Sequence, residues 1–267
     1  MGEIIQSLWI GRPLSLLEQL SITSFLRHGH DYHLFCYEKI ANVPAGVIIR
    51  DAAEILPASE IFYYQSAEGK GSVAAFANLF RYKLLLENGG WWADADIICL
   101  RPFDFAESIV FASERSVEKN QITNAVMKLP RGHVVAQQCY EAARREDFSK
   151  LIWGKTGPAL LSRIVSENKL EKFAKSPETF CPLNYWEWES LLSQDSKLLQ
   201  QLTAGKSYAV HLWHELWRRS IEFDATAKKF CRVQFSEKLR ERMELKPPLP
   251  PLHKTVFGEL LRRYEVS

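Results

Sequence analysis

Two carboxylates interrupt an apolar run near the middle of the chain. The run at 91–100 reads WWADADIICL and has the composition of a buried strand, apart from Asp94 and Asp96. Side chains at positions i and i+2 of a strand point to the same side, so we expect the two carboxylates to converge on one cation. Two hard oxygen ligands suit Mg²⁺ or Mn²⁺, which would take water and phosphate oxygens as further ligands. The pair therefore predicts a nucleotide-diphosphate site; the alternative is a solvated strand end, because short motifs often arise by chance.

Strand-like and helix-like patterns alternate along the chain, which predicts an α/β sheet with substantial parallel character. The expected strands lie at 4–9, 32–37, 47–49 and 109–111, and the expected helices at 14–26, 73–87, 134–143 and 158–165. A loop is expected at 57–69, and Asn88-Gly89-Gly90 is expected to end the helix that precedes the Asp-x-Asp pair. We expect the sheet to end near residue 215.

The length of 267 residues suits one catalytic domain, expected at 1–220, with a C-terminal helical and Pro-rich extension at 221–267. A hydrophobic fraction of 46% and a charged fraction of 25% are typical of a soluble globular protein. The net charge of +2 is too small to indicate a nucleic-acid partner. A Gly-x-x-x-x-Gly-Lys-Ser/Thr phosphate loop does not occur in the sequence, which argues against that class of phosphotransfer enzyme.

The chain carries no targeting signal that we recognise. Its N-terminus lacks the basic and apolar regions of a signal peptide, and no apolar stretch reaches the roughly 20 residues of a membrane helix. The five cysteines lack zinc-type spacing, which favours reduced thiols. We therefore expect a cytoplasmic protein, with any membrane contact peripheral to the inner membrane. Basic residues available for such contact are Lys228, Lys229, Arg232, Lys238, Arg240 and Arg242. Glutamates are interspersed among them, which favours a solvated helix face.

The segment FANLFRYKLLLENGGWWADADI at 76–97 resembles a known family. It is similar to the glycosyltransferases with a DXD-containing sugar-binding region, related to the α-1,4-glycosyltransferases and to the catalytic domains of clostridial glucosylating toxins. In that family a helix with an Arg-Tyr pair runs into Gly-Gly, an aromatic residue and the Asp-x-Asp. The resemblance implies a GT-A-type fold: a mixed, mostly parallel sheet flanked by helices.

The resemblance extends over residues 4–217 and implies roles for individual residues. It includes LWIG at 8–11, Gly157-Pro158 and AVHLWHELW at 209–217. By position, Trp9 would stack on the nucleotide base, Trp92 would line the nucleotide site, and Arg81 would contact donor phosphate or sugar. Asp94 would face the sugar and ribose and share the metal, Asp96 would be the more direct metal ligand, His211 would bind the metal or phosphates, and Asn124 would lie near the reacting sugar.

Each of these residues also has a purely structural explanation. Arg81 suits forked hydrogen bonds to phosphate or hydroxyl oxygens, but surface charges on helices are common. Trp9 is equally compatible with a place in the core, His211 with a satisfied histidine, and Asn124 with a turn or a helix cap. The spacing His211-x-x-His214-Glu215 does not match the His-Glu-x-x-His arrangement, so we exclude zinc hydrolysis.

Two positions depart from the family pattern. Asn78 stands where many relatives carry Asp, and an amide cannot act as a carboxylate base, although it can bond a donor hydroxyl. Leu216 replaces a polar residue that often precedes the last tryptophan of the pattern. These departures leave open a divergent enzyme or a reassigned chemistry.

The resemblance implies a metal-dependent, retaining hexosyltransferase. The expected donor is a nucleotide-diphosphate sugar, with a UDP-sugar as the first choice and Mn²⁺ or Mg²⁺ as the cofactor. The expected acceptor is a glycan or lipid-linked saccharide in bacterial surface polysaccharide or lipopolysaccharide synthesis. Two alternatives remain: a toxin-like or effector-like protein glycosyltransferase, and a non-catalytic nucleotide-sugar-binding protein.

Overall fold

A six-stranded sheet forms the centre of the computed structural model, which describes residues 3–11, 13–65, 69–116, 119–224, 228–232 and 249–266. The strand order is β3-β2-β1-β4-β7-β6. The strands are β1 (Ile4–Trp9), β2 (Asp31–Cys36), β3 (Ile48–Asp51), β4 (Gly90–Ala93), β6 (Val110–Arg115) and β7 (Asn120–Leu129). The pairs β3-β2, β2-β1 and β1-β4 are parallel, whereas β7 runs antiparallel to both β4 and β6. The expected mixed and mostly parallel sheet flanked by helices is confirmed.

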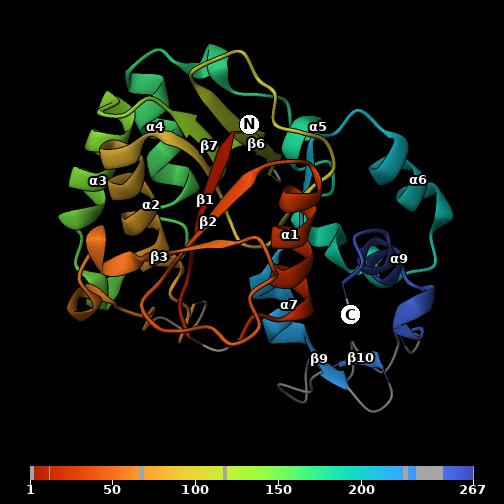
Figure 1. Ribbon diagram of the computed structural model, residues 1–267. Coiled ribbons are helices and arrows are strands. Elements are labelled where there is room, and N and C mark those ends of the chain that lie inside the picture. Colours follow the sequence, from red (N-terminus) through yellow and green to blue (C-terminus); the bar gives the residue numbers. More distant parts are fainter. Residues whose placement is uncertain are drawn as a thin grey trace.

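Helices cover both faces of this sheet (Figure 1). Helices α2, α3 and α4 lie together on one face, and α1 lies on the other. The helices are α1 (Leu16–Arg27), α2 (Ala74–Asn88), α3 (Val134–Arg144), α4 (Pro158–Glu167), α5 (Pro177–Phe180), α6 (Ser196–Ala204), α7 (His214–Ser220) and α9 (Val256–Arg263). Short 3₁₀ helices span Ala52–Glu54, Ala58–Glu60, Phe148–Lys150, Glu171–Phe173, Tyr185–Leu192 and Leu252–Lys254.

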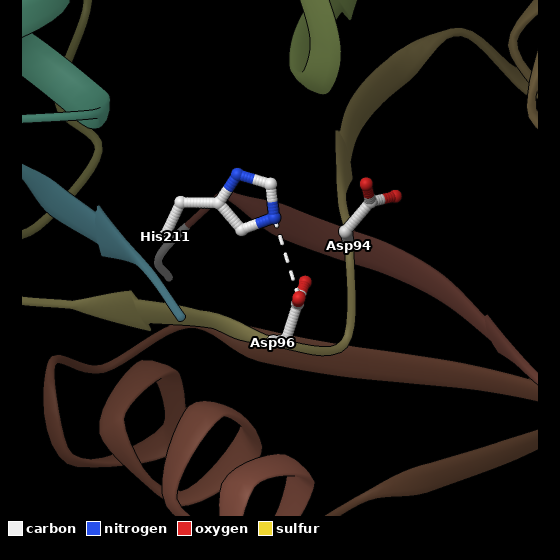
Figure 2. Close-up of side chains that lie close together, drawn as sticks. All are labelled: Asp94, Asp96 and His211. Atoms are coloured by element: carbon white, nitrogen blue, oxygen red, sulfur yellow. Dashed lines mark ion pairs between the residues drawn. The ribbon is translucent and has the colours of Figure 1, made fainter. Parts of the chain in front are cut away.

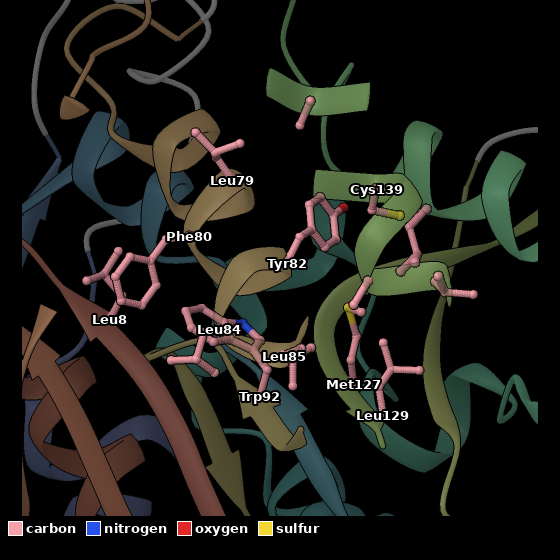
Figure 3. Packing of buried hydrophobic residues seen from close by; sticks show 14 of the residues in the cluster. Leu8, Leu79, Phe80, Tyr82, Leu84, Leu85, Trp92, Met127, Leu129 and Cys139 are labelled. Atoms are coloured by element: carbon pink, nitrogen blue, oxygen red, sulfur yellow. The ribbon is translucent and has the colours of Figure 1, made fainter. Parts of the chain in front are cut away.

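Two consecutive tryptophans bind strand β4 into both halves of the core. Trp92 packs with Leu8 and Phe80 in the cluster beneath α2 (Figure 3), whereas Trp91 packs with Phe103 and Phe180 on the opposite face. Both tryptophans are at most 1% exposed. Because side chains alternate along a strand, the WW pair buries both faces of β4 and fixes the position at which the strand ends.

The Asp-x-Asp pair follows directly on the end of a strand, as the sequence predicts, but it lies in a turn, so the expectation of one extended segment over 91–100 is wrong. Strand β4 ends at Ala93 and strand β5 (Ile97–Cys99) begins after the turn, which is closed by the Ile97 N–H donating to the Asp94 carbonyl at 3.0 Å. Strand β5 leaves the large sheet and pairs antiparallel with β8 (Ala209–His211). A continuous strand would have directed the chain straight on inside the large sheet, whereas the turn moves it to a second, two-stranded sheet.

Two further segments differ from expectation. Strand β7 was not anticipated, because its polar residues give it no clean strand pattern; Asn124 lies inside it, so the turn and cap alternatives for this residue are wrong. After residue 215, where the sheet was expected to end, β9 (Ile221–Asp224) and β10 (Lys229–Arg232) form a separate two-stranded antiparallel sheet that the sequence pattern did not predict. Both segments form strands because they pair with other strands, and a local stretch of sequence does not show such pairing.

The C-terminal part that the structure describes packs on the rest of the chain. Helix α9 contacts α1 and α6, and the buried Tyr264 hydroxyl donates to the Cys99 carbonyl at 2.8 Å. The expected domain boundary at 220 stays a prediction. Lys238, Arg240, Arg242 and the first part of the Pro-rich segment, at 246–248, lie outside the described residues. All five cysteines are described and free, and no described helix is long and apolar enough to span a membrane.

Gly89 ends α2 in a backbone conformation that tolerates no side chain. Its φ is +66°, and a Cβ atom there would lie 2.4 Å from the Arg131 backbone nitrogen. We expect Gly89→Ala to lower the free energy of unfolding by roughly 3 kcal/mol, because strain and a backbone clash add. Gly29→Ala is the matched control: φ is +79° with nothing within 4 Å of the added Cβ, so we expect about 1 kcal/mol. Urea denaturation measures both losses, and equal losses would exclude the clash.

Candidate active site

Three metal-ligating side chains converge at the turn after β4. One ligand atom each from Asp94, Asp96 and His211 lies within 4.8 Å of the others (Figure 2). The two aspartates come from the turn, and His211 comes from the end of β8, where it pairs with Ile97 across the small sheet. The antiparallel pairing of β5 with β8 therefore places the histidine beside the carboxylates.

Asp96 is held by the segment that follows β8. Its Oδ2 lies 3.3 Å from His211 Nε2 and accepts a hydrogen bond of 2.8 Å from the His214 backbone N–H. Burial by itself raises the pKa of Asp96, but the charge of His211 and these hydrogen bonds outweigh it, so the pKa lies below its ordinary value. Burial lowers the pKa of His211, yet Asp96 raises it well above the ordinary value. The two groups form a buried pair.

Asp94 is held from the opposite side. Its Oδ1 accepts a hydrogen bond of 2.8 Å from Trp92 Nε1 and lies 3.0 Å from Arg81 Nη2, and its backbone N–H donates to the Ala125 carbonyl. Burial raises the pKa of Asp94 and the Asp96 carboxylate adds to the rise, whereas Arg81 opposes it. The Asp94 side chain is 25% exposed against 12% for Asp96, so it is the more open of the two carboxylates.

Arg81 reaches this site from helix α2. Its guanidinium lies 4.9 Å from the centre of a Trp92 ring and donates to the backbone carbonyls of Asn124 and Ala77. The side chain is only 5% exposed, so the surface-charge alternative is wrong. A buried guanidinium requires a negative partner, and Asp94 supplies it.

A buried network of neutral polar groups continues from Arg81 along α2. Asn124 Nδ2 donates to Asn78 Oδ1 at 2.8 Å, and Asn78 Nδ2 donates to Thr156 Oγ1 at 3.2 Å. The Tyr82 hydroxyl donates to the Thr156 carbonyl at 3.0 Å. A Cβ atom on Gly157 would lie 3.1 Å from Asn78 Nδ2, so a glycine at this position suits the close packing of the network.

Trp9 lies at the end of β1, half-buried, with its ring parallel to His214 at 5.8 Å. His214 Nδ1 lies 2.9 Å from Oε1 of Glu18, a carboxylate in α1 that is fully buried. Burial lowers the pKa of His214, but the hydrogen bond and charge of Glu18 raise it above its ordinary value. The Glu18–His214 pair thus connects α1 to the segment that holds Asp96.

The donor set fits a divalent cation. Mg²⁺ and Mn²⁺ bind oxygen ligands at about 2.1 Å, so ligand atoms around one ion lie about 3–4 Å apart. Asp96 Oδ2 and His211 Nε2 have that spacing at 3.3 Å, and one ligand atom from each of the three side chains lies within 4.8 Å of the others. Two carboxylates with one imidazole suit Mn²⁺ better than Mg²⁺, which prefers oxygen ligands throughout.

The structure brings the predicted residues into one connected region. Arg81 and Trp92 contact Asp94, His211 contacts Asp96, and ligand atoms of Asp94, Asp96 and His211 lie within 4.8 Å of one another. Asn124 joins them through its carbonyl, Asn78 through Asn124, and Trp9 through His214. Their roles toward a donor stay predictions. Four neighbouring residues were missed: Glu18, Thr156, His214 and Glu114, which is buried and bonded by Gln121.

Only Glu18 gave a local signal among the missed residues. Ser15 and Glu18 have the spacing of a capping box, in which Glu18 accepts from the Ser15 backbone N–H at 2.7 Å. That signal predicts the start of a helix and says nothing of the second partner, His214.

Whole-chain similarity to solved glycosyltransferase structures is distant. Against the PaToxG glycosyltransferase the TM-score is 0.47 at 15% identity, covering 97% of this chain and 87% of that one. Against the ligand-free glycosyltransferase domain of the YGT toxin it is 0.44 at 8% identity, covering 100% and 99%.

Curated relatives include named glycosyltransferases from animals. The chain is 22% identical over 180 residues to lactosylceramide 4-alpha-galactosyltransferase of Pongo pygmaeus, covering 62% of this chain and 80% of the relative. It is 26% identical over 149 residues to alpha-1,4-N-acetylglucosaminyltransferase of Homo sapiens, covering 51% of this chain. The chain spans 41% of the length of the human enzyme and 43% of the length of the mouse lactosylceramide 4-alpha-galactosyltransferase.

Two family descriptions match successive parts of the chain. Residues 17–116 match the glycosyltransferase sugar-binding region containing the DXD motif, and residues 128–238 match the alpha 1,4-glycosyltransferase conserved region. The first match contains Arg81 and the turn with Asp94 and Asp96. The second contains the end of β7, the loop at 156–157 and His211, and Asn124 lies between the two matches. The chain thus carries, in this order, a region that matches the DXD-containing sugar-binding region of glycosyltransferases and a region that matches the conserved region of the α-1,4-glycosyltransferases, which supports a transferase.

Proposed function

We propose that this glycosyltransferase is metal-dependent and moves a hexose from a nucleotide-diphosphate sugar to a saccharide acceptor with retention of configuration. The observation that carries the proposal is the convergence of Asp94, Asp96 and His211, with Arg81 bonded to the first of them. Asp94, Asp96 and His211 would hold the cation, with Mn²⁺ favoured by the mixed oxygen and nitrogen ligands.

The reaction needs charge stabilisation at the departing diphosphate. The bond from the anomeric carbon to the diphosphate oxygen breaks, an acceptor oxygen forms a new bond to that carbon, and the acceptor's hydroxyl proton passes to the departing phosphate. The bound cation supplies positive charge next to the diphosphate. Arg81 fixes the orientation of Asp94 and adds positive charge on the same side.

Neutral amides suit the sugar side of the site. Asn78 and Asn124 lie next to Arg81, and their amides offer donors and acceptors of the kind that bind sugar hydroxyls. Retention requires no carboxylate base opposite the leaving group, so the asparagine at position 78 is compatible with transfer. Trp9 is the proposed platform for the base, and uracil is the proposed base.

The proposed acceptor is a glycan or a lipid-linked saccharide. The names of the curated relatives describe transfer to lactosylceramide and transfer of N-acetylglucosamine, and those relatives are animal enzymes. A role in bacterial surface polysaccharide or lipopolysaccharide synthesis, a cytoplasmic location and peripheral membrane contact stay proposals. Glycosylation of a protein, as by a toxin or effector, is the alternative within the same chemistry.

A non-catalytic nucleotide-sugar-binding protein is the second candidate. Its motivating observation is Asn78, which replaces the family's carboxylate and whose amide is engaged by Asn124 and Thr156. Metal-dependent donor binding without hydrolysis or transfer would favour it.

The first prediction concerns the cation. With Mn²⁺ and a panel of UDP-hexoses, we expect the wild-type protein to release UDP and Asp96→Ala to lose roughly 100-fold or more of that activity, because charge stabilisation is lost. Calorimetry should show Mn²⁺ binding in the presence of UDP for wild type and not for Asp96→Ala. Asp31→Ala, an exposed carboxylate at the start of β2, is the control. Equal Mn²⁺ binding by wild type and Asp96→Ala would contradict the metal site.

The second prediction concerns Glu18. Removal of its charge loosens His214, whose backbone N–H orients Asp96, so we expect Glu18→Gln to weaken Mn²⁺ binding about tenfold. Glu18→Ala should in addition lose about 1 kcal/mol of stability, because it removes the bond to Ser15 that starts α1. Glu215→Gln is the control, since Glu215 bonds Arg218 and Arg219 instead. An unchanged affinity in Glu18→Gln would show that His214 does not position Asp96.

A further inference from the structure

Two exposed aromatic side chains stand beside the proposed metal site. Tyr185 is 39% exposed and Trp186 is 49% exposed. They begin the 3₁₀ helix Tyr185–Leu192, whose later residues Trp188 and Leu191 turn into the core. We call Tyr185 and Trp186 the aromatic rim.

The rim is connected to the metal site through Trp213. The Trp213 ring lies 3.8 Å from the ring of His211, and Tyr185 meets Trp213 at 6.2 Å with an interplanar angle of 73°. Trp213 has a φ of +60°, a left-handed conformation that is rare for a bulky residue and that costs backbone strain. Its buried Nε1 has no hydrogen-bond partner among the described residues. The rim therefore continues the proposed active site.

The rim is held rigidly. The Asn184 side chain and Glu187 cap the 3₁₀ helix reciprocally, and Arg115 Nη1 donates to Asn184 Oδ1 at 3.3 Å from strand β6. The anchored segment thus exposes Tyr185 and Trp186, while Leu183 before them and Trp188 after them are buried. A preformed aromatic surface binds a ligand at low cost in conformational entropy.

The shape and charge of the rim indicate its ligand. The rings of Tyr185 and Trp186 meet at 82° with centroids 4.8 Å apart, which makes a corner rather than a flat patch. Glu187, next to the rim, is exposed and disfavours an anionic membrane surface. A pyranose ring is neutral and has one face of C–H groups that can pack on an aromatic ring, with hydroxyls left at its edge.

We propose that Tyr185 and Trp186 form the acceptor subsite and bind a sugar ring of the saccharide acceptor next to the reacting centre. This assignment rests on the proposed transferase function and names residues for the acceptor side of the same site. Loss of either ring should weaken acceptor binding and leave the donor and the metal unaffected, because Tyr185 reaches the metal-binding segment through Trp213 and Trp186 packs on Tyr185.

The test separates acceptor binding from donor chemistry. Lactose, cellobiose and maltose are titrated against the protein with UDP and Mn²⁺, with binding followed by saturation-transfer NMR; UDP-hexose hydrolysis without acceptor is measured in parallel. We expect Tyr185→Ala and Trp186→Ala each to raise the dissociation constant of the bound disaccharide about tenfold. Donor hydrolysis should stay within twofold, and Trp186→Phe should retain most of the binding. Ile49→Ala, an exposed apolar residue on β3, is the control.

Several outcomes would overturn the assignment. One is disaccharide binding that is unchanged in both alanine variants. Another is no binding of any of the three disaccharides by the wild-type protein. A third is a loss of binding to phosphatidylglycerol vesicles in the alanine variants while their disaccharide binding stays intact. Disaccharide binding that depends on the rim without any donor hydrolysis would instead uphold the subsite and contradict the transferase.

Discussion

The buried ion pair between Arg81 and Asp94 is the contact on which the site depends. Burying the Arg81 guanidinium, which is 5% exposed, would cost free energy without the opposite charge of Asp94. Together the two side chains join helix α2 to the end of strand β4. The same guanidinium donates to the Asn124 carbonyl of β7, so three separate elements meet at one side chain. With Asp94 fixed in this way, the turn places Asp96 toward β8 and His211.

The two carboxylates of the turn are held by different parts of the fold. Asp94 is held by Trp92 and Arg81 from the large sheet and α2, whereas Asp96 is held by His211 and the His214 backbone from the small sheet and α7. The turn therefore bridges two substructures, each of which orients one ligand. Such outer contacts set ligand geometry as much as the ligands themselves do, and Glu18 extends this support to α1.

The sequence predicts the alternation of elements and the cation site, but not the geometry that makes the site. The apolar run at 91–100 indicates a strand, and the structure breaks it at Asp94 because the chain changes sheets there. Whether a strand bends depends on its distant partner, here β8, which no local pattern reports. Glu18 and His214 were missed for the same reason: the capping box explains Glu18 locally, while its second partner lies far along the chain. Strand β7 was missed because Asn124 and its polar neighbours resemble a loop.

Asn78 is the position at which sequence and structure together change the interpretation. Taken alone, the loss of the family's carboxylate suggests reduced activity. In the structure the Asn78 amide accepts from Asn124 and donates to Thr156, so it uses both its oxygen and its nitrogen. A carboxylate there could only accept, and it would add a third negative charge beside Asp94 and compete for Arg81. The asparagine thus keeps the guanidinium committed to Asp94, and the departure from the family pattern is compatible with the proposed metal site.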